Sequence, residues 1–204
     1  MSVGWDASHG EFLIEDYYYF SKLKRMAKNE GIEIYQEDDF KKLGEHDVIV
    51  FNYPEEKFRS WEIRKISNWL KKGKRIVFAT YYGNMDSTAE NINKVLTKLE
   101  IPIRINGDVV VDLENNAGDM MFPICKYKTY KVVMPCASSL TTNNNALIIS
   151  ETGLTHPNGY RSPVVGAMYK DKGEIIVLGT CVFWDNYSLE LLDNKILALD
   201  ILRC

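Results

Sequence analysis

The sequence lacks an excess of basic side chains and any long apolar segment. Lysine and arginine together number 25 against 28 acidic residues, which gives a formal net charge of −3. Nucleic acids are bound by clustered basic side chains, so this balance argues against a nucleic-acid partner. No apolar run approaches the roughly 18 residues of a transmembrane helix, so we expect no membrane span.

Cysteine is scarce and scattered. The cysteines are Cys125, Cys136, Cys181 and Cys204; none forms a C-x-x-C pair, and no histidine stands near them at metal-ligand spacing. We therefore assign no metal site and no cofactor. Free thiols indicate a reducing compartment, so we expect the protein to be cytoplasmic. The G-x-S-x-G motif that carries the nucleophile of many α/β hydrolases is also absent.

Strand-like and helical segments alternate through the first half of the chain. The pattern predicts strands at 2–6, 32–36, 46–54 and 75–83, and helices at 11–30, 60–70 and 90–99, the last capped by Ser87 and Glu90. The VIVF run at 48–51 is apolar on both faces, as a strand covered on both sides requires. We therefore expect a mostly parallel sheet with helices on both faces, in one α/β domain over residues 1–204.

The second half has a different pattern. Residues 101–150 contain several short strand candidates separated by ENNAGD and TTNNN, which predicts a β-rich insertion within the same domain. A hairpin with the turn KDKG is predicted at 162–181, and a last helix at about 187–202. Asn91 and Asn194 fall within predicted helices, where asparagine is unfavourable, so we expect them to make buried polar contacts.

Polar and aromatic side chains follow four of the predicted strands. The loops are 6–11, 52–58, 80–87 and 179–186. Ligands of open α/β sheets bind at the carboxyl ends of the strands, so we expect these loops to converge on one cleft. The candidate ligand-binding residues are Asp6, Ser8, His9, Glu11, Tyr81, Tyr82, Asn84 and Asp185.

The opening DASHGE segment allows more than one interpretation. His9 is the best candidate for a catalytic acid or base, with Asp6 or Glu11 orienting it. A carboxylate–histidine–carboxylate set is also a donor set for a metal ion. However, Ser8 and Glu11 match a capping box at the start of a helix, which is a structural role.

Several segments together resemble a known family. They are DASHGE before a helix, HDVIVFNYPEEKFRSWEIRKISNWLKKGKRIVF, ENINKVLTKLEIPI and the closing IIVLGTCVFWDN with LDNKILALDIL. The chain resembles GIFT-type domains, which occur in gliding-motility transporter-associated proteins and in an intraflagellar transport subunit. Those domains are similar to class I glutamine amidotransferases and to ThuA-like proteins. The resemblance implies a flavodoxin-like, three-layer α/β sandwich.

The same resemblance implies a binding or assembly role. The amidotransferase Cys–His–Glu triad has no counterpart here, because Tyr81 and Tyr82 occupy the turn where the nucleophile is expected. Aromatic side chains beside aspartate and asparagine suit a carbohydrate-like ligand. Our leading hypothesis is therefore a non-catalytic domain that binds a small molecule. The alternatives are a hydrolase that uses His9 with Asp6 or Glu11, and an interaction module whose YYYF run at 17–20 forms a homo-oligomer face.

Overall fold

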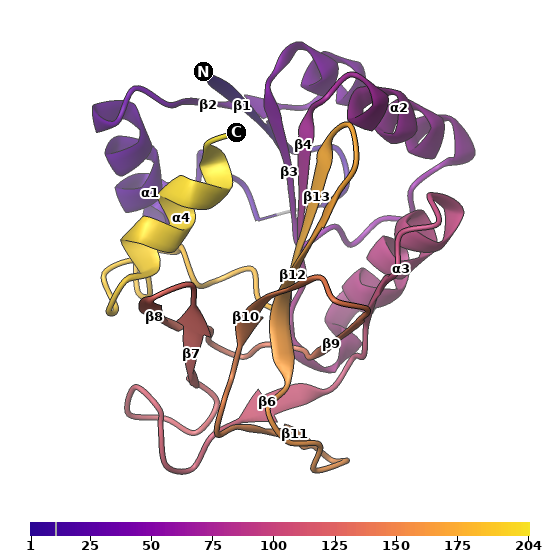
Figure 1. Cartoon of the computed structure of the whole chain (residues 1–204). Helices are drawn as coiled ribbons and strands as arrows, with labels where there is room; N and C mark the ends of the chain where they lie inside the picture. The colour runs from indigo at the N-terminus through magenta and orange to yellow at the C-terminus, as the bar shows by residue number, and fades with distance from the viewer. Residues whose placement is uncertain (11) are drawn as a thin grey trace.

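Five parallel strands form the half of the sheet that is covered by helices on both faces. The computed structural model describes residues 1–10 and 12–204. The parallel strands lie in the order β2 (Glu33–Glu37), β1 (Ser2–Asp6), β3 (Val48–Asn52), β4 (Arg75–Ala79) and β13 (Glu174–Leu178) (Figure 1). The strand order reverses beside β1, because the chain passes first to β2 on one side and then to β3 on the other.

Antiparallel strands continue the sheet and form the lower end of the molecule in Figure 1. The sheet runs from β13 through β12 (Val164–Lys170), β10 (Ala146–Ile149) and β7 (Ile124–Tyr127) to β8 (Tyr130–Val133). A branch pairs β12 with β9 (Leu140–Thr142) and β9 with β5 (Ile103–Ile105), while β6 (Val109–Val111) and β11 (Leu154–His156) make a separate ribbon. The predicted fold class, a mostly parallel α/β sheet with a β-rich segment at 101–150, is confirmed.

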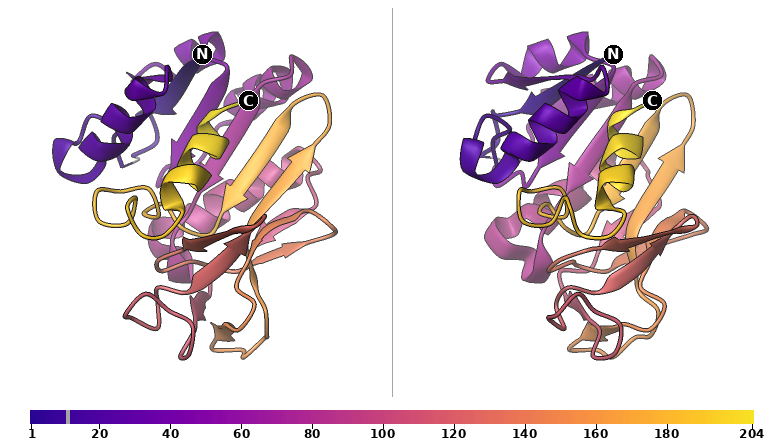
Figure 2. Two further views of the ribbon diagram at one scale, coloured as in Figure 1. Left: turned by 60° about the vertical axis from the view of Figure 1, so that its left-hand side comes forward. Right: turned by 90° about the vertical axis from the view of Figure 1, so that its left-hand side faces the viewer.

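The helices lie in two layers. Helices α1 (Tyr17–Asn29) and α4 (Asn194–Leu202) lie side by side on one face, and α2 (Ser60–Lys71) and α3 (Thr88–Lys98) cover the other (Figures 1 and 2). Strand β3 shows why the sheet needs both layers. Its alternate residues Val48 and Val50 join the core under α1 and α4, whereas Ile49 and Phe51 join the core under α2 and α3. An apolar run without alternation is the pattern such a strand requires.

Three predicted helix starts are wrong. Helix α1 begins at Tyr17, later than predicted, because the Asp16 carboxylate caps it by accepting a hydrogen bond from the Tyr18 N–H at 2.9 Å. Helix α4 begins at Asn194, after a series of turns. Ser87 does not cap α3 with its side chain; the Asn84 side chain accepts the Glu90 N–H instead. A 3₁₀ helix, η2 (Tyr82–Ser87), precedes α3, and another, η1 (Phe40–Glu45), precedes β3.

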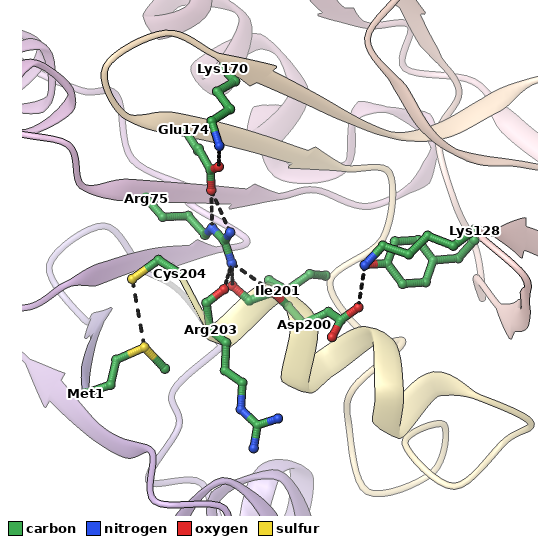
Figure 3. A network of polar contacts seen from close by, with 10 residues as sticks. Met1, Arg75, Lys128, Lys170, Glu174, Asp200, Ile201, Arg203 and Cys204 are labelled. Atoms are coloured by element: carbon green, nitrogen blue, oxygen red, sulfur yellow. Dashed lines mark hydrogen bonds and ion pairs between the residues drawn. The ribbon is translucent and has the colours of Figure 1, made fainter.

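Helix α4 is fastened to the sheet at its carboxyl end, as Figure 3 shows. The Arg75 guanidinium donates to the backbone carbonyls of Asp200 and Ile201 at 2.8 and 3.1 Å, and also to that of Arg203. Its other nitrogens, Nε and Nη2, contact Glu174 Oε2 at 2.8 and 2.6 Å. A guanidinium at this position satisfies helix carbonyls that have no partner within the helix and favours the negative end of the helix dipole.

The amino end of α4 is held by Asn194, which is fully buried. Its amide nitrogen donates to the carbonyls of Val133, Phe183 and Ser188 at 2.9–3.0 Å, and its oxygen accepts the Val133 N–H at 2.8 Å. Asn91 likewise donates to the carbonyls of Pro54 and Glu55. The predicted buried contacts of both asparagines are confirmed. Together Arg75 and Asn194 fix the segment between β13 and α4, which forms one wall of the cavity described next.

Candidate functional site

A cavity of about 510 Å³ opens at the carboxyl ends of the parallel strands. It lies where the strand order reverses between β1 and β3, the position at which open α/β sheets bind ligands. Its walls come from the loops after β1, β3, β4 and β13, from α1 and from the β-rich segment. We call it the aromatic cavity, and it is lined by Phe12, Tyr19, Phe20, Tyr53, Glu55, Tyr81, Met85, Asp86, Phe122, Pro135, Cys136, Val182, Asp185, Tyr187 and Ser188.

Tyr53 is at the centre of this arrangement. Its ring is stacked on Phe12, with the ring centroids 4.7 Å apart and the planes 3° from parallel. Its hydroxyl donates to Asp86 Oδ2 at 2.5 Å. Burial raises the pKa of Tyr53, and the hydrogen bond to Asp86 raises it further, so the phenol stays protonated. Tyr81 stands nearly perpendicular to Tyr53, at 77° and 6.2 Å between centroids, and the two rings form a corner.

The backbone around the cavity is strained. Tyr53, Asp86 and Cys136 all line the cavity with φ of 70°, 50° and 51°. A bulky residue such as Tyr53 rarely adopts this left-handed region, at a cost of about 1–3 kcal/mol, whereas aspartate adopts it more readily. Such strain persists only where the surrounding structure imposes it, and it gathers at binding and active sites. The neighbouring Asn84 and Ser87 share this conformation at 51° and 63°.

Asp185 supplies a carboxylate to the cavity wall. Its Oδ1 accepts the N–H groups of Tyr187 and Ser188 at 3.0 and 2.8 Å. Burial raises the pKa of Asp185, and the two backbone donors only partly offset that rise. Burial likewise raises the pKa of Tyr81, as does its hydrogen bond with Cys136. The cavity therefore holds protonated phenols next to carboxylates, which together accept and donate hydrogen bonds.

His9 lies on the other side of the sheet from the aromatic cavity. Its side chain is 3% exposed, and its ring is stacked on Phe58 at 4.3 Å, in the core under α2 and α3. Nδ1 is 2.6 Å from Asp6 Oδ2, and Nε2 is 3.4 Å from Glu62 Oε2. Ser8 donates its hydroxyl to Asp6 Oδ1 at 2.7 Å. His9 thus links the loop after β1 to the start of α2.

The carboxylates beside His9 favour its charged form. Burial lowers the pKa of His9, but the hydrogen bond and charge of Asp6, with those of Glu62, outweigh burial and raise the pKa above 6.5. A raised pKa in the folded state stabilises the fold below pH 6.5. This stabilisation is lost as the pH rises through the folded-state pKa.

Replacing His9 by glutamine is expected to destabilise the protein more at pH 6 than at pH 8.5, because the lost contribution belongs to the imidazolium. Urea unfolding of both proteins at the two pH values measures the difference. His156→Gln, at an exposed histidine, is the control and is expected to change stability equally at both. A larger effect of His9→Gln at pH 8.5 would contradict the assignment.

The loops after β1, β3, β4 and β13 meet at the aromatic cavity as expected, but the residues expected to line one cleft are divided among several places. Tyr81 and Asp185 line the aromatic cavity. Ser8 and His9 line a separate cavity of about 360 Å³, with Asp6 buried beside them. Tyr82 lines a third cavity, in the β-rich part, and Asn84 caps α3. Glu11 lies outside the described residues, so the predicted Ser8–Glu11 capping box has no outcome.

Sequence reasoning missed Phe12, Tyr53 and Asp86. The one available signal was position, since Tyr53 directly follows the apolar strand β3 and Asp86 lies in the loop after β4. Among residues 1–10 and 12–204 we find no group of three histidine, cysteine or acidic side chains arranged to hold a metal ion. Within those same ranges, no helix has the length and apolar character that crossing a membrane requires.

Comparisons with known proteins place this chain in a family. The model of a domain of unknown function, DUF4350, matches residues 20–202. The chain belongs to the DUF4350 family. An uncharacterized protein of Aquifex aeolicus (strain VF5) is 36% identical over 222 residues, which cover 100% of this chain and 93% of the relative.

Solved structures show what this DUF4350 chain is similar to in fold. The mmIFT52 N-terminal domain superposes with a TM-score of 0.80 at 19% identity, over 97% of this chain and 93% of that domain. The cytoplasmic protein STM3548 from Salmonella typhimurium gives 0.51 at 12% identity, over 88% and 87%. The GH42 β-galactosidase Gan42B gives 0.50 at 10%, but the match spans only 28% of that enzyme. The likeness to the GIFT-like mmIFT52 domain agrees with the fold implied by the sequence resemblance.

Proposed function

We propose that the chain is a non-catalytic binding domain whose aromatic cavity takes a small hydroxylated ligand of the size of a sugar. The observation that carries this proposal is the position of Tyr53 in the cavity wall. Its backbone is left-handed, its ring is stacked on Phe12, and its hydroxyl donates to Asp86. A volume of about 510 Å³ is in the range of small-molecule sites. Aromatic faces pack on the apolar face of a sugar ring, and carboxylates accept its hydroxyl groups.

The alternative hydrolase has less support than the binding domain, although His9 lines the second cavity. Its best catalytic candidate, His9, is buried against Phe58, and carboxylates of Asp6 and Glu62 occupy both of its ring nitrogens. A general base needs a ring nitrogen that can reach the substrate proton, and both nitrogens of His9 already contact carboxylates. We therefore propose a structural role for His9.

Binding is expected to raise the melting temperature. Neutral monosaccharides and disaccharides tested one by one by differential scanning fluorimetry should include at least one that stabilises the protein. At 100 times its Kd a ligand adds about 2.7 kcal/mol, which corresponds to roughly 6 °C for a domain of this size. Tyr81→Ala should abolish the shift, because it removes one side of the aromatic corner.

Tyr160→Ala is the matched control, since Tyr160 is exposed and lies outside the aromatic cavity. It should leave the shift unchanged. An equal loss of the shift in both variants, or the absence of any shift across the whole panel, would contradict the proposal.

The cytoplasmic location and a homo-oligomer remain predictions. Tyr17 and Tyr18 are exposed, so part of the YYYF run is available for self-association.

A further inference from the structure

The charged side chains of the aromatic cavity are all of one sign. Its lining includes Glu55, Asp86 and Asp185, and none of its described lining residues is lysine, arginine or histidine. The aromatic rings add the partial negative charge of their faces. Any ligand that enters this space therefore meets a negative potential from several directions.

Neutral groups, and not basic side chains, hold two of these carboxylates. Asp86 accepts the phenolic O–H of Tyr53, and Asp185 accepts backbone N–H groups. The basic residues on adjacent segments are directed elsewhere: Lys22 pairs with Glu190, and Lys57 lines the neighbouring cavity. The negative charge of the aromatic cavity is therefore left for a ligand to balance.

The rings are arranged as walls for a cation. Tyr53 and Tyr81 meet edge to face at 77°, and Tyr81, which is half-buried where Tyr53 is 3% exposed, offers the more open ring. Phe12 stacks on Tyr53, and Tyr19 follows Phe12 with centroids 6.3 Å apart, which extends the aromatic wall towards the surface. Ammonium groups bind over such faces, and the attraction grows where water is excluded and carboxylates stand nearby.

We propose that the ligand of the aromatic cavity is a cation, namely a hydroxylated small molecule that carries an ammonium group, such as an amino sugar. This inference rests on the proposed function and specifies the class of ligand. The hydroxyl groups pair with Asp86 and Asp185, and the ammonium group lies between the tyrosine corner and Glu55. An anionic sugar is excluded by the same charges.

Three sugars with the same ring and different groups at one carbon test the role of charge. Glucosamine carries a protonated amine at pH 7, N-acetylglucosamine has that nitrogen neutralised, and glucose has a hydroxyl in its place. Isothermal titration should give glucosamine at least a tenfold lower Kd than either neutral sugar. The preference should weaken as salt is raised, because screening acts on the charge alone.

Glu55→Gln supplies the test at the residue level, with Glu56→Gln as its control. The two glutamates are neighbours and both exposed, but Glu55 lines the aromatic cavity and Glu56 the cavity beside His9. Glu55→Gln should weaken the binding of glucosamine several-fold more than that of glucose, because it removes a charge and keeps a hydrogen-bonding group. Glu56→Gln should change neither value.

The outcomes distinguish this inference from the proposed function. Equal Kd values for glucosamine and glucose would overturn the inference and leave the sugar-binding proposal in place. Binding of tetramethylammonium without binding of any sugar would support a cation site and overturn the hydroxylated ligand. Failure of tetramethylammonium and all three sugars to bind would overturn the inference, and the absence of any shift across the whole panel of neutral sugars would overturn the proposed function as well.

Discussion

Replacing Arg75 by methionine is expected to lower the free energy of unfolding by about 3 kcal/mol, the size typical of breaking a buried ion pair from one side. The Arg75 and Glu174 side chains are only 11% and 16% exposed. The variant would leave Glu174 with Lys170 as its remaining partner, at 2.9 Å, and would uncap the carbonyls at the end of α4. Urea unfolding at pH 7 measures the loss.

The pH dependence of the Arg75 variant gives an independent check. Burial raises the pKa of Glu174, but Lys170 and Arg75 outweigh burial and lower it below 4.5. A lowered pKa stabilises the fold above pH 4.5, and this contribution is lost as the pH falls through the folded-state pKa. The difference between the wild type and Arg75→Met should therefore shrink in acid.

The control for Arg75 is an exposed ion pair. Lys126 and Glu151 are 59% and 62% exposed and 3.3 Å apart. Lys126→Met should change stability by less than about 0.5 kcal/mol, because exposed pairs contribute little. If the two methionine variants were equally stable, Arg75 would not anchor α4 as described.

Replacing Asn194 by aspartate is expected to be at least as damaging, with a loss of about 4 kcal/mol at pH 7. The change removes the amide donor and turns a carboxylate oxygen towards the carbonyls of Val133, Phe183 and Ser188 in a buried site. Both N–H donors of the amide are lost and a charge is buried without a partner, a combination that strongly destabilises proteins.

The pKa of the new carboxyl in Asn194→Asp should shift in the opposite direction to that of Glu174, although the stability defect should shrink in acid in both cases. Burial beside carbonyl oxygens should raise the pKa of the new carboxyl, so the variant loses stability as the pH rises from about 4. Urea unfolding at pH 4.5 and pH 7 should show a smaller defect in acid. Asn143→Asp, at an exposed position, is the control and should change stability little at either value. A pH-independent defect would show that lost packing, and not charge, is responsible.

The fold could be predicted because its main features depend on local patterns. The VIVF run of β3 is apolar without alternation since both faces of that strand are covered. Asn194 was recognisable because asparagine is a poor residue for a helix unless its amide is used. The start of α1 was harder to predict from the sequence. The Ser8 hydroxyl contacts Asp6, and the side chain that caps α1 is that of Asp16.

The division of the candidate site could not be predicted for a physical reason. A loop that leaves a strand can turn to either face of the sheet, and packing decides which. His9 turned towards Phe58 and the core under α2, whereas Tyr53 turned towards Phe12 and α1. The sequence shows that both loops are at the same edge of the sheet, but the direction depends on contacts between distant segments.

The left-handed backbone at Tyr53 has a consequence for protein engineering. Glycine or asparagine would adopt φ of 70° more readily than tyrosine does. Tyr53→Gly would relieve this strain, but it would also remove a ring that is 3% exposed and part of the core, so a library of replacements at Tyr53 screened for heat resistance should favour side chains that keep this packing. Scoring the same library for ligand retention would show whether thermostability and recognition compete for this one position.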